Sequence, residues 1–154
     1  MTRPETLRRE DLSPEWRALL AASLEARDHA YAPYSNFAVG AAVRTDSGRI
    51  FAGCNIENAS FGLTVCAERV AIFKAVCQGE SRIVAMAVST EGGATPCGAC
   101  RQVMAEFAAD MPVLLSDVSG HLRMTSLRDL LPDAFSSLEL SQETDSTARK
   151  EVSS

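Results

Sequence analysis

Apolar residues recur at the spacing of a helix in several segments of the chain. The first helix is predicted over residues 13–29, because Ser13-Pro14 offers a hydroxyl cap and a proline that costs no hydrogen bond. Its apolar stripe, which we assign to the core, consists of Trp16, Leu19, Leu20 and Leu24. Further helices are predicted over residues 65–77, from Thr95-Pro96 onward and over residues 127–131.

The apolar segments between these helices predict strands. Residues 37–45 and 49–56 are rich in small and β-branched side chains and flank a turn at residues 46–48, which indicates a hairpin. Residues 83–89 and 111–115 are nearly continuous apolar runs, typical of strands covered on both faces, and a short edge segment follows Gly120. This alternation predicts an α/β fold of three layers, α/β/α, with helices on both faces of a mixed sheet of about five strands.

The length of the chain, 154 residues, fits a single domain, which we expect over residues 1–140. After about Leu140 the composition changes to Ser, Thr, Glu and Lys, and only Ala148 and Val152 are apolar. Residues 141–154 are therefore predicted to form a disordered tail.

The charge balance limits the partners. Fifteen Lys and Arg against twenty Asp and Glu give a net charge of −5, and no basic run is longer than two residues. A polynucleotide binder neutralises phosphates with a basic surface, so we expect no nucleic acid polymer as partner. No apolar run reaches the roughly 18 residues that cross a bilayer, and the charged N-terminal segment lacks the apolar core of a signal peptide. We therefore expect no membrane partner and a cytoplasmic, reducing location.

The cysteines carry the most specific chemistry. Cys97 and Cys100 lie three residues apart at a predicted helix start, so both sulfurs lie on one side of the first turn. The N-terminus of a helix favours thiolate over thiol, and thiolate is the form that binds metal. Cys66, at another predicted helix start, supplies a third sulfur if the two helices lie side by side. Three protein ligands leave the fourth position of a tetrahedral zinc open, which is typical of a catalytic site.

Two other interpretations of the cysteines stay open. Cys97 and Cys100 also have the spacing of a thiol–disulfide redox pair, although this leaves Cys66 and Glu68 without a role. Alternatively, the zinc is structural and closed by a fourth protein ligand, for which the candidates are His29, His121, Cys54 and Cys77. Otherwise, Cys54 and Cys77 are interpreted as buried core cysteines on a strand and on a helix face.

Charged residues accompany the cysteines. Glu68 lies two residues after Cys66, where a carboxylate is better placed to move protons than to bind zinc, since thiolates fill the protein positions. Three thiolates exceed the charge of one Zn²⁺. Arg69 and Arg101 are candidates to offset that excess by hydrogen bonds to sulfur.

The segment Cys66-Ala67-Glu68, followed by Pro96-Cys97-Gly98-Ala99-Cys100, has the form of the zinc-deaminase signature. With cysteine as the first ligand, the chain resembles the small homotetrameric cytidine deaminases of the zinc-dependent cytidine/deoxycytidylate deaminase superfamily. The resemblance covers about residues 12–138, and three more segments resemble the family's opening strand, nucleoside-binding segment and C-terminal motif: residues 31–42, 53–60 and 130–135.

The resemblance implies hydrolysis of cytidine and deoxycytidine to uridine and deoxyuridine with release of ammonia, as in pyrimidine salvage. It implies one Zn²⁺ per chain, and the implied ligands are Cys66, Cys97 and Cys100. It makes Glu68 the catalytic residue that carries a proton to ring N3. The implied substrate-binding residues are Phe37, Asn55, Glu57, Ala67 and Phe135.

Each implied contact has a definite place on the nucleoside. Asn55 and Glu57 would bind the ribose 3′-hydroxyl, and the Ala67 backbone amide would bind the base carbonyl. Phe37 would pack against the pyrimidine. Phe135 would reach into the site of a neighbouring subunit and stack on the base, so that active sites are shared within a homotetramer.

Three alternative functions stand beside this expectation. An aminonucleoside deaminase of the blasticidin type shares the zinc core, an editing deaminase acts on a polynucleotide, and a structural-zinc module catalyses nothing. The chain also departs from the family pattern in two places. Phe61 stands where Tyr is more common, which removes a hydroxyl, and the wall at residues 91–94 is rich in glycine.

Overall fold

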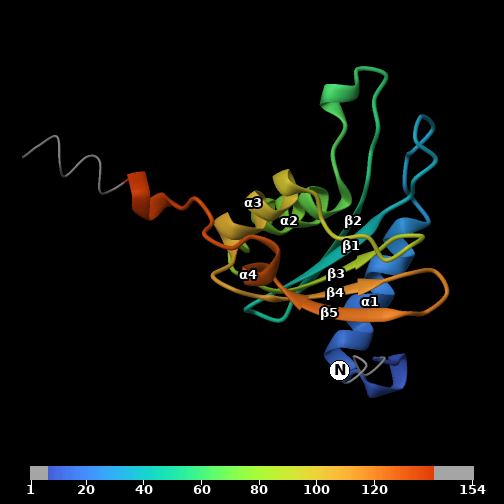
Figure 1. Cartoon of the computed structure of the whole chain (residues 1–154), viewed down its shortest axis with the longest axis horizontal. Helices are drawn as coiled ribbons and strands as arrows, with labels where there is room; N and C mark the ends of the chain where they lie inside the picture. Colours follow the sequence, from blue (N-terminus) through green and yellow to red (C-terminus); the bar gives the residue numbers. More distant parts are fainter. Residues whose placement is uncertain (1–6, 141–154) are drawn as a thin grey trace, which may run out of the picture.

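The computed structural model describes residues 7–140, built around a five-stranded sheet in the order β2-β1-β3-β4-β5 (Figure 1). The strands are β1 (Gly40–Thr45), β2 (Ile50–Cys54), β3 (Ile83–Ser89), β4 (Pro112–Ser116) and β5 (Leu122–Ser126). The α-helices are α1 (Pro14–Arg27), α2 (Ala67–Cys77), α3 (Gly98–Phe107) and α4 (Leu127–Leu130), and 3₁₀ turns form at Arg9–Asp11 and Phe61–Leu63. The predicted tail, residues 141–154, lies outside the described residues.

The sheet is mixed, as predicted. β3 and β4 are parallel, whereas β1–β2, β1–β3 and β4–β5 are antiparallel. The predicted hairpin joins β1 to β2 and pairs Gly40 with Cys54. Its turn uses Gly48 at a φ of 89°, a left-handed conformation that costs glycine little. The connection from β3 to the parallel β4 runs through α3, as a parallel pair requires a crossover.

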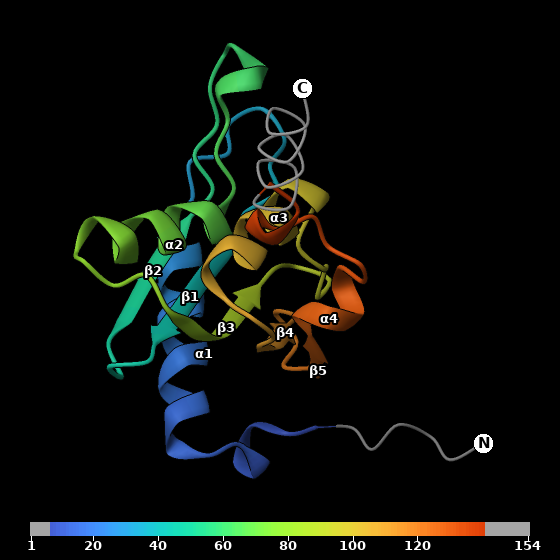
Figure 2. The same cartoon turned by 90° about the vertical axis from the view of Figure 1, so that its left-hand side faces the viewer.

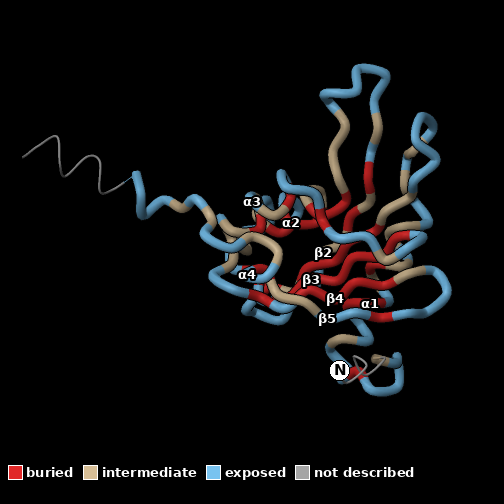
Figure 3. The backbone as a smooth tube through the Cα atoms, viewed as in Figure 1, coloured by how far each residue is buried: buried red, intermediate tan, exposed pale blue. Residues whose placement is uncertain are grey.

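Helices cover both faces of the sheet (Figure 2). α1 packs on one face through Leu19 and Leu20, while α2 and α3 pack on the other. Successive residues of β3 point alternately to the two cores: Ala85 and Ala87 face α1, and Met86 and Val88 face α2 and α3. Buried residues accordingly run along the inner strands (Figure 3). The three-layer α/β/α prediction is confirmed.

Two glycines let the helices approach the sheet closely. A Cβ on Gly53 of β2 would lie 2.7 Å from the backbone nitrogen of Ala71, so α2 packs directly on this strand. A Cβ on Gly40 of β1 would lie 1.9 Å from the carbonyl oxygen of Ser23 in α1. Both contacts are too short for any side chain. Within residues 7–140, no helix combines the length and the hydropathy needed to cross a membrane.

Some predicted boundaries are wrong. The third helix begins at Gly98 instead of Thr95, and the second at Ala67 instead of residue 65. The residues before them, Cys97 and Cys66, have extended backbones and are the N-caps. Apolar spacing continues through a cap, so it does not reveal where helical dihedral angles begin.

The core assignments of two cysteines also need correction. Cys77, the last residue of α2, is exposed, and Cys54 on the edge strand β2 is only half-buried. Cys77 lies at the end of its helix, and Cys54 lines a cavity at the edge of the sheet. Trp16 is half-buried as well and packs at the margin of the α1 core.

The close approach of α1 to β1 can be tested by Gly40→Ala. We expect a loss of about 2–3 kcal/mol or more in the free energy of unfolding, because the new methyl group collides with backbone atoms of Ser23 and Arg27. Urea unfolding followed by circular dichroism measures the loss. Gly92→Ala is the matched control, since a Cβ there meets no atom within 4 Å. Equal stability of the two variants would contradict the tight packing.

Candidate active site

Three cysteine sulfurs meet where α2 and α3 begin. Cys66 is the N-cap of α2, Cys97 is the N-cap of α3, and Cys100 lies in the first turn of α3. The Cys66 and Cys97 sulfurs are 3.9 Å apart, and those of Cys97 and Cys100 are 3.5 Å apart. All three sulfurs lie within 4.8 Å of one another. The helices therefore lie side by side, as the three-sulfur interpretation requires.

The surroundings of this cluster favour negative charge on one sulfur, that of Cys66. Hydrogen bonds from Cys100 and from Arg69 lower the pKa of Cys66 to about 5. The same Cys66–Cys100 interaction, together with burial, raises the pKa of Cys100. The Cys66 thiolate thus pairs with the Cys100 thiol, and a bound cation would displace the thiol protons. Arg69 Nη2 lies 3.5 Å from Cys66 Sγ and contributes positive charge.

These donors fit one zinc ion. Three thiolates suit a soft divalent metal, and three protein ligands leave a tetrahedral zinc with one open position. Among the described residues the potential ligand group consists of Cys66, Cys97 and Cys100. The four candidates for a closing ligand of a structural site do not join it, and His121 Nδ1 instead pairs with Asp117 Oδ2 at 2.9 Å. The donor set is that of an open, catalytic type of metal site.

Glu68 lies beside the cluster in the first turn of α2 and is only 5% exposed. Burial, and next the charge on Cys66, raise the pKa of the Glu68 carboxyl above its usual range. A carboxyl group whose pKa is moved toward neutrality can both accept and donate a proton near pH 7. Glu68 thus has the environment of a general acid–base group.

A cavity of about 230 Å³ opens beside the cluster. Its lining includes Cys66, Cys97 and Glu68. The lining also includes four residues expected to bind substrate: Phe37, Asn55, Glu57 and Ala67. These residues come from the loop before β1, the end of β2 and the start of α2, which only the folded chain brings together. Sequence reasoning did not single out Thr90 and Thr95, which also line it.

Asn55 and Glu57 bind backbone groups of the loop before β1. Asn55 Oδ1 accepts from Val39 N at 2.9 Å, and its Nδ2 donates to the Phe37 oxygen at 2.7 Å. Glu57 Oε1 accepts from Tyr34 N at 2.9 Å and Ser35 N at 3.1 Å. The two side chains therefore shape the wall that carries Phe37. This segment is irregular instead of the strand expected from residue 37, and the β1–β2 pairing ends at Gly40 and Cys54.

The expectation that Arg101 binds sulfur is wrong. Its guanidinium donates to Pro96 O at 2.7 Å, Leu130 O at 2.6 Å and Thr95 Oγ1 at 3.1 Å. A long side chain on a helix points toward the N-terminus, which brings this guanidinium to the loop before Cys97. Arg101 thus braces the start of α3 against the end of α4.

Phe135 lies away from the cavity lining of its own chain. The residue is 58% exposed, and its carbonyl oxygen accepts a hydrogen bond from Gln102 Nε2 at 3.0 Å. The backbone of the C-terminal segment is thereby attached to α3 while the aromatic side chain remains in solvent.

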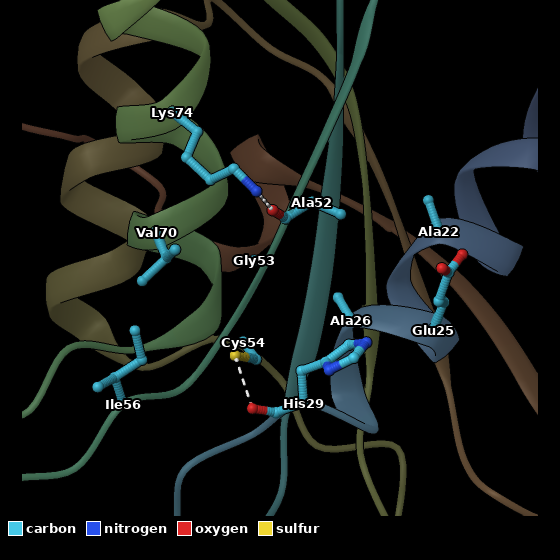
Figure 4. Close-up of a pocket in the computed structure, with 10 residues that line it drawn as sticks. All are labelled: Ala22, Glu25, Ala26, His29, Ala52, Gly53, Cys54, Ile56, Val70 and Lys74. Carbon is cyan, nitrogen blue, oxygen red and sulfur yellow. Dashed lines mark hydrogen bonds between the residues drawn. The ribbon is translucent and has the colours of Figure 1, made fainter.

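A second and larger cavity, of about 480 Å³, lies along the free edge of β2 between α1 and α2 (Figure 4). Lys74 Nζ donates there to Ala52 O at 2.5 Å, and Cys54 Sγ to His29 O at 3.4 Å. Its lining includes neither the cysteine cluster nor Glu68. The smaller cavity therefore contains the candidate catalytic groups, and cavity volume alone does not identify the active site.

Comparison with known proteins agrees with this geometry. The family model of the cytidine and deoxycytidylate deaminase zinc-binding region matches residues 14–115, which include every member of the cysteine cluster. The chain belongs to the cytidine and deoxycytidylate deaminase family.

Individual relatives of this family match most of the chain. A cytidine deaminase of Sporosarcina psychrophila is 52% identical over 126 residues, which are 80% of this chain and 93% of the relative. A cytidine deaminase of Mycobacterium tuberculosis is 43% identical and covers 84% of this chain and 96% of its own. The crystal structure of cytidine deaminase from Burkholderia pseudomallei superposes with a TM-score of 0.75 at 50% identity, covering 80% of this chain and 100% of that one.

Metal content tests the cluster directly. Because three thiolates hold the ion, we expect Cys100→Ser to lose most of its zinc, while the wild type retains about one zinc per chain. Atomic absorption on protein dialysed against a mild chelator measures the stoichiometry. Cys77→Ser removes an exposed thiol outside the cluster and is the control. Full zinc retention in Cys100→Ser would exclude this ligand.

Proposed function

We propose that this chain is a zinc-dependent hydrolase that converts cytidine and deoxycytidine to uridine and deoxyuridine with release of ammonia. One observation carries the proposal. A three-sulfur cluster and a buried carboxyl, Glu68, line a single cavity in a chain of the cytidine deaminase family. The redox-pair interpretation leaves this carboxyl unexplained.

Zinc, when bound by Cys66, Cys97 and Cys100, lowers the pKa of water to about 7 and so supplies a nucleophile at neutral pH. In the overall reaction the water oxygen bonds to C4 and the C4–amine bond breaks. One proton of the water ends on ring N3 and the other leaves with the amine as ammonia. Glu68 is proposed to carry both protons, and its raised pKa supports that role.

The lining of the cavity supports the proposed substrate contacts. Phe37 would pack against the pyrimidine, and the backbone amide of Ala67 would bind the base carbonyl. Asn55 and Glu57 would bind the 3′-hydroxyl of the sugar with acceptor positions not used by the backbone. A 3′-hydroxyl is common to ribose and 2′-deoxyribose, so this arrangement accepts both nucleosides.

We further propose a homotetramer in which Phe135 of one subunit completes the site of another. Phe135 supports this, because its side chain is exposed while its backbone is bound to α3. Two further exposed aromatic residues beside the site, Tyr34 and Phe61, also support it, and their ring centroids lie 5.7 Å apart. A cytoplasmic location is proposed as well, because a reducing compartment keeps free cysteines in the thiol form.

Glu68→Gln tests the proton-transfer role. We expect kcat for cytidine to fall by roughly 10²- to 10⁴-fold with zinc content unchanged, because an amide acts as neither an acid nor a base near pH 7. The loss of absorbance as cytidine is deaminated gives the rate, and blasticidin assayed in parallel tests the aminonucleoside alternative. Glu80→Gln, on the turn that follows α2, is the control. Wild-type protein that turns over neither cytidine nor deoxycytidine would refute the proposed function.

Shared active sites can be tested by mixing subunits. Phe135→Ala should raise KM for cytidine about tenfold, since stacking on a base contributes on the order of 1–3 kcal/mol. Co-expression of Phe135→Ala and Glu68→Gln chains with two different tags gives mixed oligomers. Some of their sites should combine an intact Glu68 with the intact Phe135 of a neighbour and recover the wild-type KM. A mixture that keeps the KM of Phe135→Ala would contradict shared sites.

A further inference from the structure

The Ser35 hydroxyl links two residues of the cavity wall. Its Oγ accepts a hydrogen bond from Phe37 N at 3.1 Å and donates one to Glu57 Oε2. All three residues line the cavity beside the cysteine cluster. A hydroxyl group can accept and donate at one atom, which neither an alanine nor a backbone group can do at this position.

The hydrogen bonds of Glu57 leave it with little remaining capacity. Its Oε1 already accepts two backbone bonds, from Tyr34 N and Ser35 N, and its Oε2 accepts from Ser35 Oγ. A carboxylate offers about four acceptor positions. The free position therefore lies on Oε2, the oxygen whose direction the Ser35 hydroxyl sets. The Ser35 hydrogen bond is also the main reason why the pKa of Glu57 is lowered, which keeps this carboxyl ionised.

The backbone of Phe37 is held from both sides. Ser35 Oγ binds its N–H, and Asn55 Nδ2 binds its carbonyl oxygen at 2.7 Å. Asn36, which lies between Ser35 and Phe37 in the chain, has a φ of 55°, in the left-handed region that non-glycine residues rarely occupy. A backbone hydrogen bond from Asn36 N to Ala32 O at 3.0 Å closes this turn, and the two side chains fix the orientation of Phe37 directly after it.

We propose that Ser35 is a positioning residue for nucleoside binding: its hydroxyl orients the free acceptor of Glu57 toward the sugar and holds Phe37 against the base. The inference rests on the proposed function and adds to it a determinant of sugar recognition. Ser35 does not touch the reacting atoms, so its removal weakens substrate binding and leaves the chemical step intact.

Kinetics of Ser35→Ala test this assignment. We expect KM for cytidine to rise about tenfold or more, the effect of losing a hydrogen bond to a charged group, with kcat within about twofold of wild type. Ser35→Thr retains the hydroxyl and should restore most of the affinity. Ser47→Ala is the matched control. Ser47 lies in the turn between β1 and β2, and its Oγ also donates a hydrogen bond to a glutamate, Glu80, at 2.9 Å. Its KM should equal that of wild type.

A substrate that lacks the 3′-hydroxyl shows whether Ser35 acts through Glu57. With 3′-deoxycytidine, the KM ratio of Ser35→Ala to wild type should shrink to the part that arises from Phe37, whereas 2′-deoxycytidine should keep the full ratio. In the double variant Ser35→Ala/Glu57→Gln, the KM should likewise exceed that of Glu57→Gln alone only by the part that arises from Phe37.

The outcomes separate this inference from the proposed function. If the wild type deaminates cytidine but Ser35→Ala has an unchanged KM, or loses kcat instead, the inference is wrong and the function stands. An equal KM ratio with cytidine and 3′-deoxycytidine also overturns it. Zinc content and melting temperature verify that Ser35→Ala is folded, and should it not fold, Ser35→Cys, with a weak donor in place of the hydroxyl, must show an intermediate KM.

Discussion

Three sulfur atoms within 4.8 Å of one another impose the main constraint on this structure. Thiolates at such distances repel each other, so they require a cation together with fixed positive partners. The N-termini of α2 and α3, together with Arg69, provide the fixed positive charge. This arrangement is possible only if α2 and α3 start at the same end of the sheet on one face. The parallel β3–β4 crossover and the absent side chain of Gly53 make that placement possible.

Hydrogen bonds from side chains to backbone build the rest of the site around this centre. The loop before β1 is irregular at residues 37–39, where the Asn55 side chain binds the backbone of Phe37 and Val39, while Glu57 binds the backbone at Tyr34 and Ser35. Arg101 does the same for the loop before Cys97 and for the end of α4. These side chains allow irregular backbone to form a defined cavity wall. The walls are therefore held in a defined conformation, although they contain little regular structure.

Much of the fold and the site could be predicted from local patterns. The alternation of apolar runs and helical stripes indicated the strands, the helices and both covered faces, because burial on a strand or a helix leaves a periodic trace. The Cys97–Cys100 spacing indicated two sulfurs on one turn. Other features leave no such trace. The sulfur contact expected of Arg101 and the burial expected of Cys77 were wrong, since both depend on which elements lie nearby in space.

The sequence by itself determined the kind of chemistry. Three cysteines at predicted helix starts and a neighbouring glutamate specify thiolate ligands and a proton carrier, because residue type and spacing within one turn are local properties. Only the tertiary structure decided how these groups act together. It joined Cys66 to the other two sulfurs across 31 residues, buried Glu68 and so raised its pKa, and placed Ser35 between Phe37 and Glu57. Desolvation and hydrogen-bond direction depend on residues distant in the chain, and no local pattern contains them.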